Sequence, residues 1–96
     1  MLDKMKQLME MKRQADQIKK ELDAEIVQVS DVKGIRVVVN GSMNFQAVDI
    51  EEGLLKPENK KSLERDLLRS LNIAIKKSQV LAAEKMKNML PGFPGL

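Results

Sequence analysis

The C-terminal third of the chain contains a long segment without proline or glycine, and its length limits the folds open to the whole chain. The segment begins near Asn59, a residue type that often caps a helix N-terminus, and it runs to about Met89. Apolar or small side chains recur every three or four positions along one face, namely Leu63, Leu67, Leu71, Ala74, Ser78 and Leu81. This pattern predicts a helix of about thirty residues, which would be about 45 Å long.

The first 23 residues predict a second long helix, since they also contain no proline or glycine. Their apolar positions step by three and four residues along a single narrow seam: Leu8, Met11, Ala15, Ile18 and Leu22. A seam of this kind requires a partner helix or the face of a sheet.

Three short segments between the helices predict β-strands at residues 24–30, 34–40 and 44–50, because β-branched residues are frequent there. In the second segment Ile35, Val37 and Val39 alternate onto one face, and in the third segment Val48 and Ile50 do so. The connections are short and glycine lies near them, which is typical of hairpins. An antiparallel meander is therefore expected.

The predicted fold is α+β in the order α-β-β-β-α, with residues 1–90 as a single domain and residues 91–96 as a flexible C-terminal tail. A strand of seven residues spans about 23 Å, so a three-stranded sheet cannot cover two helices of this length. The meander also leaves its edges unpaired. Both features favour a homodimer from which the helices protrude.

Composition excludes several kinds of chemistry. The chain has no cysteine and no histidine, which removes thiolate and imidazole metal sites and Ser-His catalysis. No phosphate-cradling glycine motif and no catalytic constellation occurs, so we expect no enzymatic activity, no cofactor, no metal and no small-molecule substrate. Charged residues interrupt the N-terminal segment and no apolar run is long enough to span a membrane, so a cytoplasmic protein without membrane contact is expected.

Positive charge is concentrated in the C-terminal part of the chain. Residues 56–96 hold nine basic and four acidic side chains, a net of +5 within an overall net charge of +3. On the long helix, Arg65, Arg69, Lys76 and Lys87 cluster opposite the apolar face, and the neighbouring acids lie off that stripe. The stripe predicts an interaction with a row of phosphates.

The first helix is more ambiguous. Four acid–base pairs are spaced four residues apart and are predicted to neutralise each other: Lys6–Glu10, Lys12–Asp16, Asp16–Lys20 and Lys19–Asp23. Arg13 and, to a lesser extent, Lys20 remain available for an anionic ligand. A solvated face paired with itself is an equally good interpretation of this helix.

Several segments, taken in order, resemble the YbaB/EbfC family of bacterial nucleoid-associated proteins. They are "VVVNGSMNFQAVDI" with Leu54-Leu55, then "LERDLLRSLNIAIKKS" with its Asn72 and Ala74, then "LPGF". The resemblance implies a small homodimer with an α-β-β-β-α fold whose helices project from the sheet like tweezers and bind DNA. It also supports Arg13, Lys19 and Lys20 as further binding residues.

The sequence thus predicts a cytoplasmic, nucleoid-located homodimer that binds double-stranded DNA mainly through phosphates. The candidate residues are Arg65, Arg69, Lys76, Lys87, Arg13, Lys19 and Lys20. The alternative is a helical scaffold that recruits a protein through its apolar seam, with the charges serving only solubility.

Overall fold

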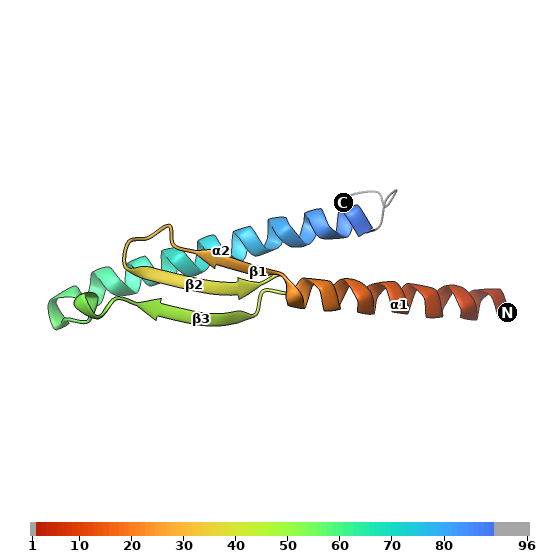
Figure 1. Ribbon diagram of the computed structural model, residues 1–96, viewed down its shortest axis with the longest axis horizontal. Helices are drawn as coiled ribbons and strands as arrows, with labels where there is room; N and C mark the ends of the chain where they lie inside the picture. The colour runs from red at the N-terminus through yellow and green to blue at the C-terminus, as the bar shows by residue number, and fades with distance from the viewer. Residues whose placement is uncertain (1, 90–96) are drawn as a thin grey trace.

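The computed structural model describes residues 2–89 and confirms the predicted order of elements. Helix α1 (Leu2–Ala24) leads into strands β1 (Ile26–Val29), β2 (Ile35–Asn40) and β3 (Phe45–Ile50). Two 3-10 turns, η1 (Glu52–Leu54) and η2 (Pro57–Asn59), then precede helix α2 (Lys60–Met89). The molecule is elongated, 66 × 20 × 16 Å, and α1 and α2 extend past the same end of the sheet (Figure 1). The predicted tail at residues 91–96 lies outside the described residues.

The three strands form the predicted antiparallel meander in the order β1-β2-β3. Val37 pairs with Val29 on one side and with Val48 on the other, so these three side chains share a face of the sheet. A shift of register between Val38 and Val39 brings Val39 opposite Phe45. The alternation predicted for β2 is confirmed, because Ile35, Val37 and Val39 are all buried.

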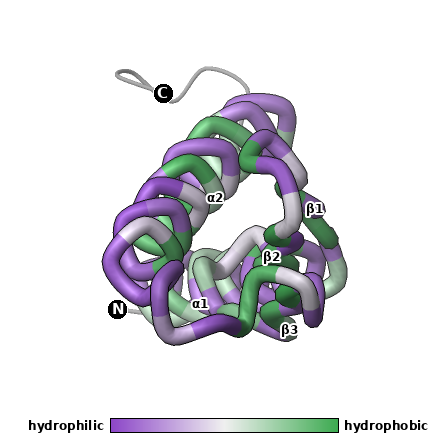
Figure 2. The backbone as a smooth tube through the Cα atoms, turned by 90° about the vertical axis from the view of Figure 1, so that its left-hand side faces the viewer, coloured by the Kyte–Doolittle hydropathy of each residue, from purple (hydrophilic) through white to green (hydrophobic). Residues whose placement is uncertain are grey.

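Helix α2 lies across one face of the sheet, mainly over β1 and β2, as the end view in Figure 2 shows. Its small residues Ser70, Ala74 and Ser78 are fully buried, which allows the helix to approach the valines of the sheet closely. The Ser78 hydroxyl donates a 2.8 Å hydrogen bond to the Asn40 carbonyl at the end of β2. The core is therefore a thin layer between α2 and two strands, and it leaves β3 largely uncovered.

The apolar seam of α1 is mostly exposed, so the partner that the seam was predicted to require covers only its C-terminal part within the described residues. Ile18 is buried and Leu22 is half-buried, whereas Leu8 and Met11 are 66% and 61% exposed. The reason is geometric. The helix extends past the end of the sheet, so most of its length lies beyond β2 (Figure 1).

The start of α2 also differs from the prediction. Asn59 belongs to the 3-10 turn η2, which runs directly into the helix, and its side-chain amide donates a 3.2 Å hydrogen bond to the Leu54 carbonyl. Asn59 therefore ties the helix start to the preceding turn η1, a role different from the N-cap that its residue type suggested.

The root of α1 is held by the turn between β2 and β3. The Gly41 N–H donates to the Leu22 carbonyl at 2.9 Å and to the Glu25 carbonyl at 3.0 Å. The buried Asn40 amide donates to the Asp23 carbonyl at 3.3 Å, and its side-chain oxygen accepts the N–H groups of Ser42 and Asn44. Because the Asn40 carbonyl also accepts from Ser78 on α2, this turn joins both helices to the sheet.

Candidate nucleic-acid interface

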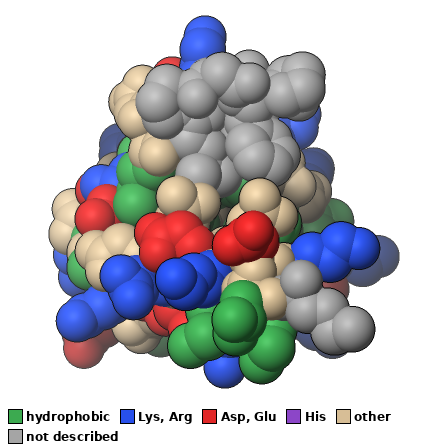
Figure 3. Space-filling view, turned by 90° about the vertical axis from the view of Figure 1, so that its right-hand side faces the viewer, with side chains coloured by type: hydrophobic (Ala, Val, Ile, Leu, Met, Phe, Trp, Pro, Cys, Tyr) green, Lys and Arg blue, Asp and Glu red, His purple; other side chains and the backbone are tan. Residues whose placement is uncertain are grey.

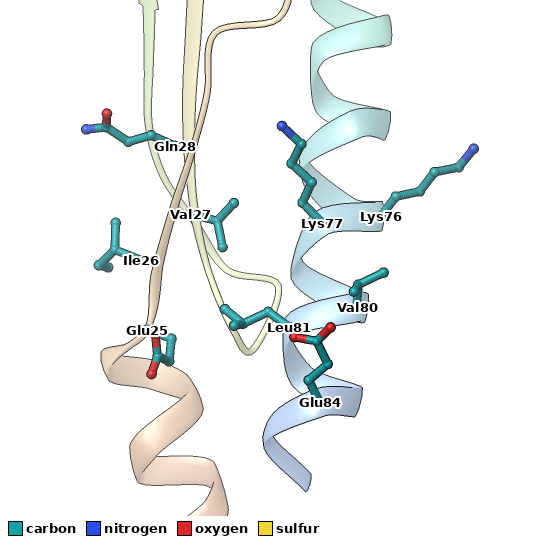
Figure 4. A pocket seen from close by; sticks show the side chains of 9 residues that line it. All are labelled: Glu25, Ile26, Val27, Gln28, Lys76, Lys77, Val80, Leu81 and Glu84. Carbon is teal, nitrogen blue, oxygen red and sulfur yellow. The ribbon is translucent and has the colours of Figure 1, made fainter. Parts of the chain in front are cut away.

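The four basic residues predicted on the long helix all lie exposed on α2. Arg65, Arg69, Lys76 and Lys87 are on the side opposite the buried residues Ser70, Ala74 and Ser78. Figure 4 shows that Lys76 points away from the sheet, whereas the next residue, Lys77, extends toward the strand side. Lys77 forms a 3.2 Å ion pair with Asp31, which separates it from this row. We call Arg65, Arg69, Lys76 and Lys87 the α2 basic row.

One acid lies closer to the α2 basic row than the sequence suggested. The Arg65 guanidinium is 4.0 Å from the Asp66 carboxylate; the Arg65 side chain is largely exposed and that of Asp66 is half-buried. Exposed pairs at this distance contribute little, about 0–1 kcal/mol, and exchange readily with other partners. Arg65 therefore stays available to an anion that offers a closer contact.

The charges of α1 are arranged differently from the prediction. None of the four pairs predicted at a spacing of four residues lies within 4.0 Å among residues 2–89; instead Arg13 forms a 3.7 Å pair with Glu10. Lys19 and Lys20 are exposed and form no ion pair with any described residue. The prediction is therefore wrong for the four pairs and for Arg13, which has a nearby acid, whereas Lys20 is exposed and unpaired among the described residues, as predicted.

The structure brings the middle of α1 near the end of α2. Arg13 and Ile18 line a shallow cleft of ≈ 190 Å³ together with Met89, the last described residue of α2. Viewed from this end, basic and acidic side chains lie side by side over the two helices (Figure 3). The α1 candidates therefore lie on the same projecting part of the molecule as Lys87, whereas Arg65 lies at the far end of α2.

Sequence analysis missed Lys85, which has a different role from the α2 basic row. Lys85 is half-buried, whereas the other basic residues in the described helix α2 are exposed. Its ammonium group is 2.8 Å from the Glu25 carboxylate and 3.4 Å from that of Glu21. No spacing rule could have found this cluster, since about sixty residues separate its members along the chain.

A groove of ≈ 580 Å³ lies between β1 and α2, with Val27 and Leu81 at its floor and Lys77 and Glu84 at its rim (Figure 4). Its charged rim and open shape do not resemble an enclosed catalytic pocket. Among residues 2–89, no three acidic side chains gather closely enough to hold a metal ion. No helix in the described part of the chain is long and apolar enough to cross a membrane.

The fold is thus a small α+β body from which two helices with exposed basic side chains project, an arrangement suited to binding an anionic partner. The chain belongs to the YbaB/EbfC DNA-binding family, which it matches over residues 1–93, and the predicted resemblance is confirmed. It is 33% identical to a nucleoid-associated protein of Chloroflexus aurantiacus over 96% of this chain and 93% of that protein. It is 30% identical to a nucleoid-associated protein of Bartonella quintana over 94% and 91% of the two chains.

The fold also has a counterpart among solved structures. The crystal structure of an uncharacterized protein of Helicobacter pylori superposes with a TM-score of 0.75, covering 86% of this chain and 88% of that one at 24% identity. At this level of identity the similarity shows a shared fold.

Proposed function

We propose that this protein binds double-stranded DNA as a homodimer, mainly through phosphate contacts, and that it contributes to nucleoid organisation and gene regulation. The observation that carries the proposal is the α2 basic row, which is exposed along its whole length and faces away from the core. Membership of a DNA-binding family and the names of its relatives support DNA as the ligand. The proposed role is binding, without catalysis.

The dimensions of the α2 basic row suit a duplex. At about 1.5 Å per residue, the distance along the helix from Arg65 to Lys87 is about 33 Å, close to one turn of B-DNA at roughly 34 Å. Lysine and arginine contacts to phosphates displace condensed counterions, so affinity falls steeply as salt rises. Arg13, Lys19 and Lys20 on α1 would add contacts from the second helix, and a dimer would double the number.

The proposed dimer surface is β3, because this strand has exposed apolar side chains and an unpaired edge. Val48 lies on the same face as the buried Val37 but is 48% exposed, since α2 covers mainly β1 and β2. Phe45 is 42% exposed nearby. Covering an exposed edge strand with a second copy removes unpaired backbone groups and apolar surface together.

Val48→Asp is expected to convert the dimer to a monomer, since it places a carboxylate on the proposed apolar contact. The measurement is light scattering coupled to size-exclusion chromatography at several protein concentrations. Val80→Asp is the matched control: Val80 is 59% exposed on α2 and lies away from β3. A Val48→Asp protein that stays dimeric would rule out β3 as the dimer surface. Loss of the dimer in both variants would show that the effect of Val48→Asp is not specific to β3.

A second candidate function is a protein-interaction scaffold, which one observation favours. Exposed apolar side chains are concentrated in the first half of α1: Leu2, Met5, Leu8, Met9 and Met11. Hydrophobic side chains gather at the lower edge of the end view in Figure 3. Under this alternative, replacing Arg65, Arg69 and Lys76 with Glu would leave recruitment of the protein partner intact.

Titration of the wild-type protein against a labelled duplex of about 30 base pairs tests the DNA proposal directly. Fluorescence anisotropy at a series of salt concentrations is expected to show binding whose log–log salt slope is steep, on the order of 0.9 per phosphate neutralised. Absence of binding at low salt would overturn the proposal and favour the scaffold.

A further inference from the structure

Lys85 connects two helices that have few other contacts with each other. It lies on the side of α2 that faces α1, and its side chain is 28% exposed, less than any other basic side chain found in an ion pair among residues 2–89. Its two partners come from different parts of the α1 junction. Glu21 is in the last turns of α1, and Glu25 is the residue between α1 and β1.

The charges of this cluster favour one another. The hydrogen bond to Glu25 raises the pKa of Lys85 above its ordinary value, and Glu21 contributes in the same direction. The pKa of Glu21 is lowered, chiefly by a hydrogen bond from Gln17 and also by Lys85. Each charged form is thus favoured by the presence of the other.

The rest of α1 has little to hold its direction. Its root is tied by the hydrogen bonds of Asn40 and Gly41 to the carbonyls of Leu22 and Asp23. Beyond the root, Ile18 is the single buried side chain described in the helix. Lys85 contacts α1 at Glu21, so about 28 Å of helix extends past this point at about 1.5 Å per residue.

We propose that Lys85, by binding Glu21 and Glu25 together, is a positioning residue that sets the separation of the projecting parts of α1 and α2. The separation matters because Arg13, Lys19 and Lys20 must reach the same duplex as Lys87 on α2. A rotation of α1 by about 10° at the Lys85 contact would move Arg13, about 12 Å away along the helix, by about 2 Å and the far end of α1 by about 5 Å. The DNA part of this inference rests on the proposed function, whereas the separation of the helices does not.

The separation can be measured without DNA. The chain has no cysteine, so Gln7→Cys and Asn88→Cys allow spin labels to be placed on exposed positions of α1 and α2. Labelled chains are mixed with excess unlabelled chains so that one labelled copy is present per assembly. Pulsed electron resonance is expected to give a narrow distance distribution that widens and shifts by about 4 Å when Glu21→Gln and Glu25→Gln are introduced together, since Gln7 lies about 21 Å along the helix from Glu21.

The Glu21→Gln/Glu25→Gln variant also tests DNA binding, because positioning and bulk charge predict changes of DNA affinity in opposite directions. Removing two acids makes the protein more positive, so charge alone predicts tighter binding. Positioning predicts weaker binding, by about three- to fivefold for loss of an exposed charge cluster. Glu51→Gln with Glu52→Gln is the matched control, because these exposed acids follow β3 and lie away from Lys85.

Exchanging the positive and negative charges of the cluster tests whether the ion pairs themselves set the helix separation. Lys85→Glu alone is expected to shift the distances and weaken binding, and adding Glu21→Lys with Glu25→Lys should restore both, provided that circular dichroism shows native helix content. An unchanged distance distribution in the Gln double variant would overturn the proposal. Shifted distances with DNA affinity equal to that of the control would overturn its DNA part. If the wild type fails to bind DNA, the proposed function fails, and the distances alone decide the role of Lys85.

Discussion

The Arg65→Ala/Arg69→Ala/Lys76→Ala variant should bind double-stranded DNA about 10- to 100-fold more weakly than the wild type at moderate salt, with a log–log salt slope smaller by about one for each lost contact. The three side chains are exposed on the face of α2 opposite the core, so their truncation leaves the packing of Ser70, Ala74 and Ser78 intact. Fluorescence anisotropy with a duplex of about 30 base pairs measures both quantities.

A control variant with the same loss of charge distinguishes the loss of phosphate contacts from the loss of net positive charge. Lys33→Ala/Lys56→Ala/Lys60→Ala also removes three exposed positive charges, all of them outside the α2 basic row. Its salt slope should stay near that of the wild type, since bulk charge affects affinity without removing specific phosphate contacts. Equal slopes for the two triple variants would contradict the assignment of DNA contact to the α2 basic row.

Gly41→Ala should destabilise the folded protein by about 1–3 kcal/mol, because the added methyl group has no room. A Cβ at this position would be 2.7 Å from the Leu22 backbone carbonyl oxygen and 3.2 Å from the Leu22 Cα. Backbone atoms cannot move aside as the end of a flexible side chain can. The hydrogen bonds from the Gly41 N–H to Leu22 and Glu25 would lengthen, and the root of α1 would separate from the turn.

Urea denaturation followed by circular dichroism, at matched protein concentration, gives the change in the free energy of unfolding. Gly53→Ala is the control, since a Cβ there meets no atom within 4 Å. That substitution should be neutral or slightly stabilising, by up to about 1 kcal/mol, through its effect on the unfolded chain. A Gly41→Ala protein as stable as the Gly53→Ala protein would show that the turn tolerates a displacement of α1.

The basic residues illustrate which parts of the candidate site were accessible to sequence reasoning. The α2 basic row was predicted correctly as an exposed face, because helical periodicity alone places Arg65, Arg69 and Lys76 opposite the apolar residues. The pairing of charges on α1 was not predicted correctly, because several exposed partners of nearly equal energy compete around Arg13 and Lys20. Lys85 was missed altogether, since its acids are remote in sequence.

The sequence by itself determined the local structure of this protein: the two helices, the three strands and the inward face of β2 all follow from the period of the apolar residues. Only the tertiary structure decided how these elements meet. It left most of the α1 seam and the strand β3 exposed, made Asn40 and Gly41 the junction of both helices, and brought Lys85 to Glu21 and Glu25. The reason is that periodicity records which face of an element avoids water, whereas the partner of that face depends on contacts between residues distant along the chain.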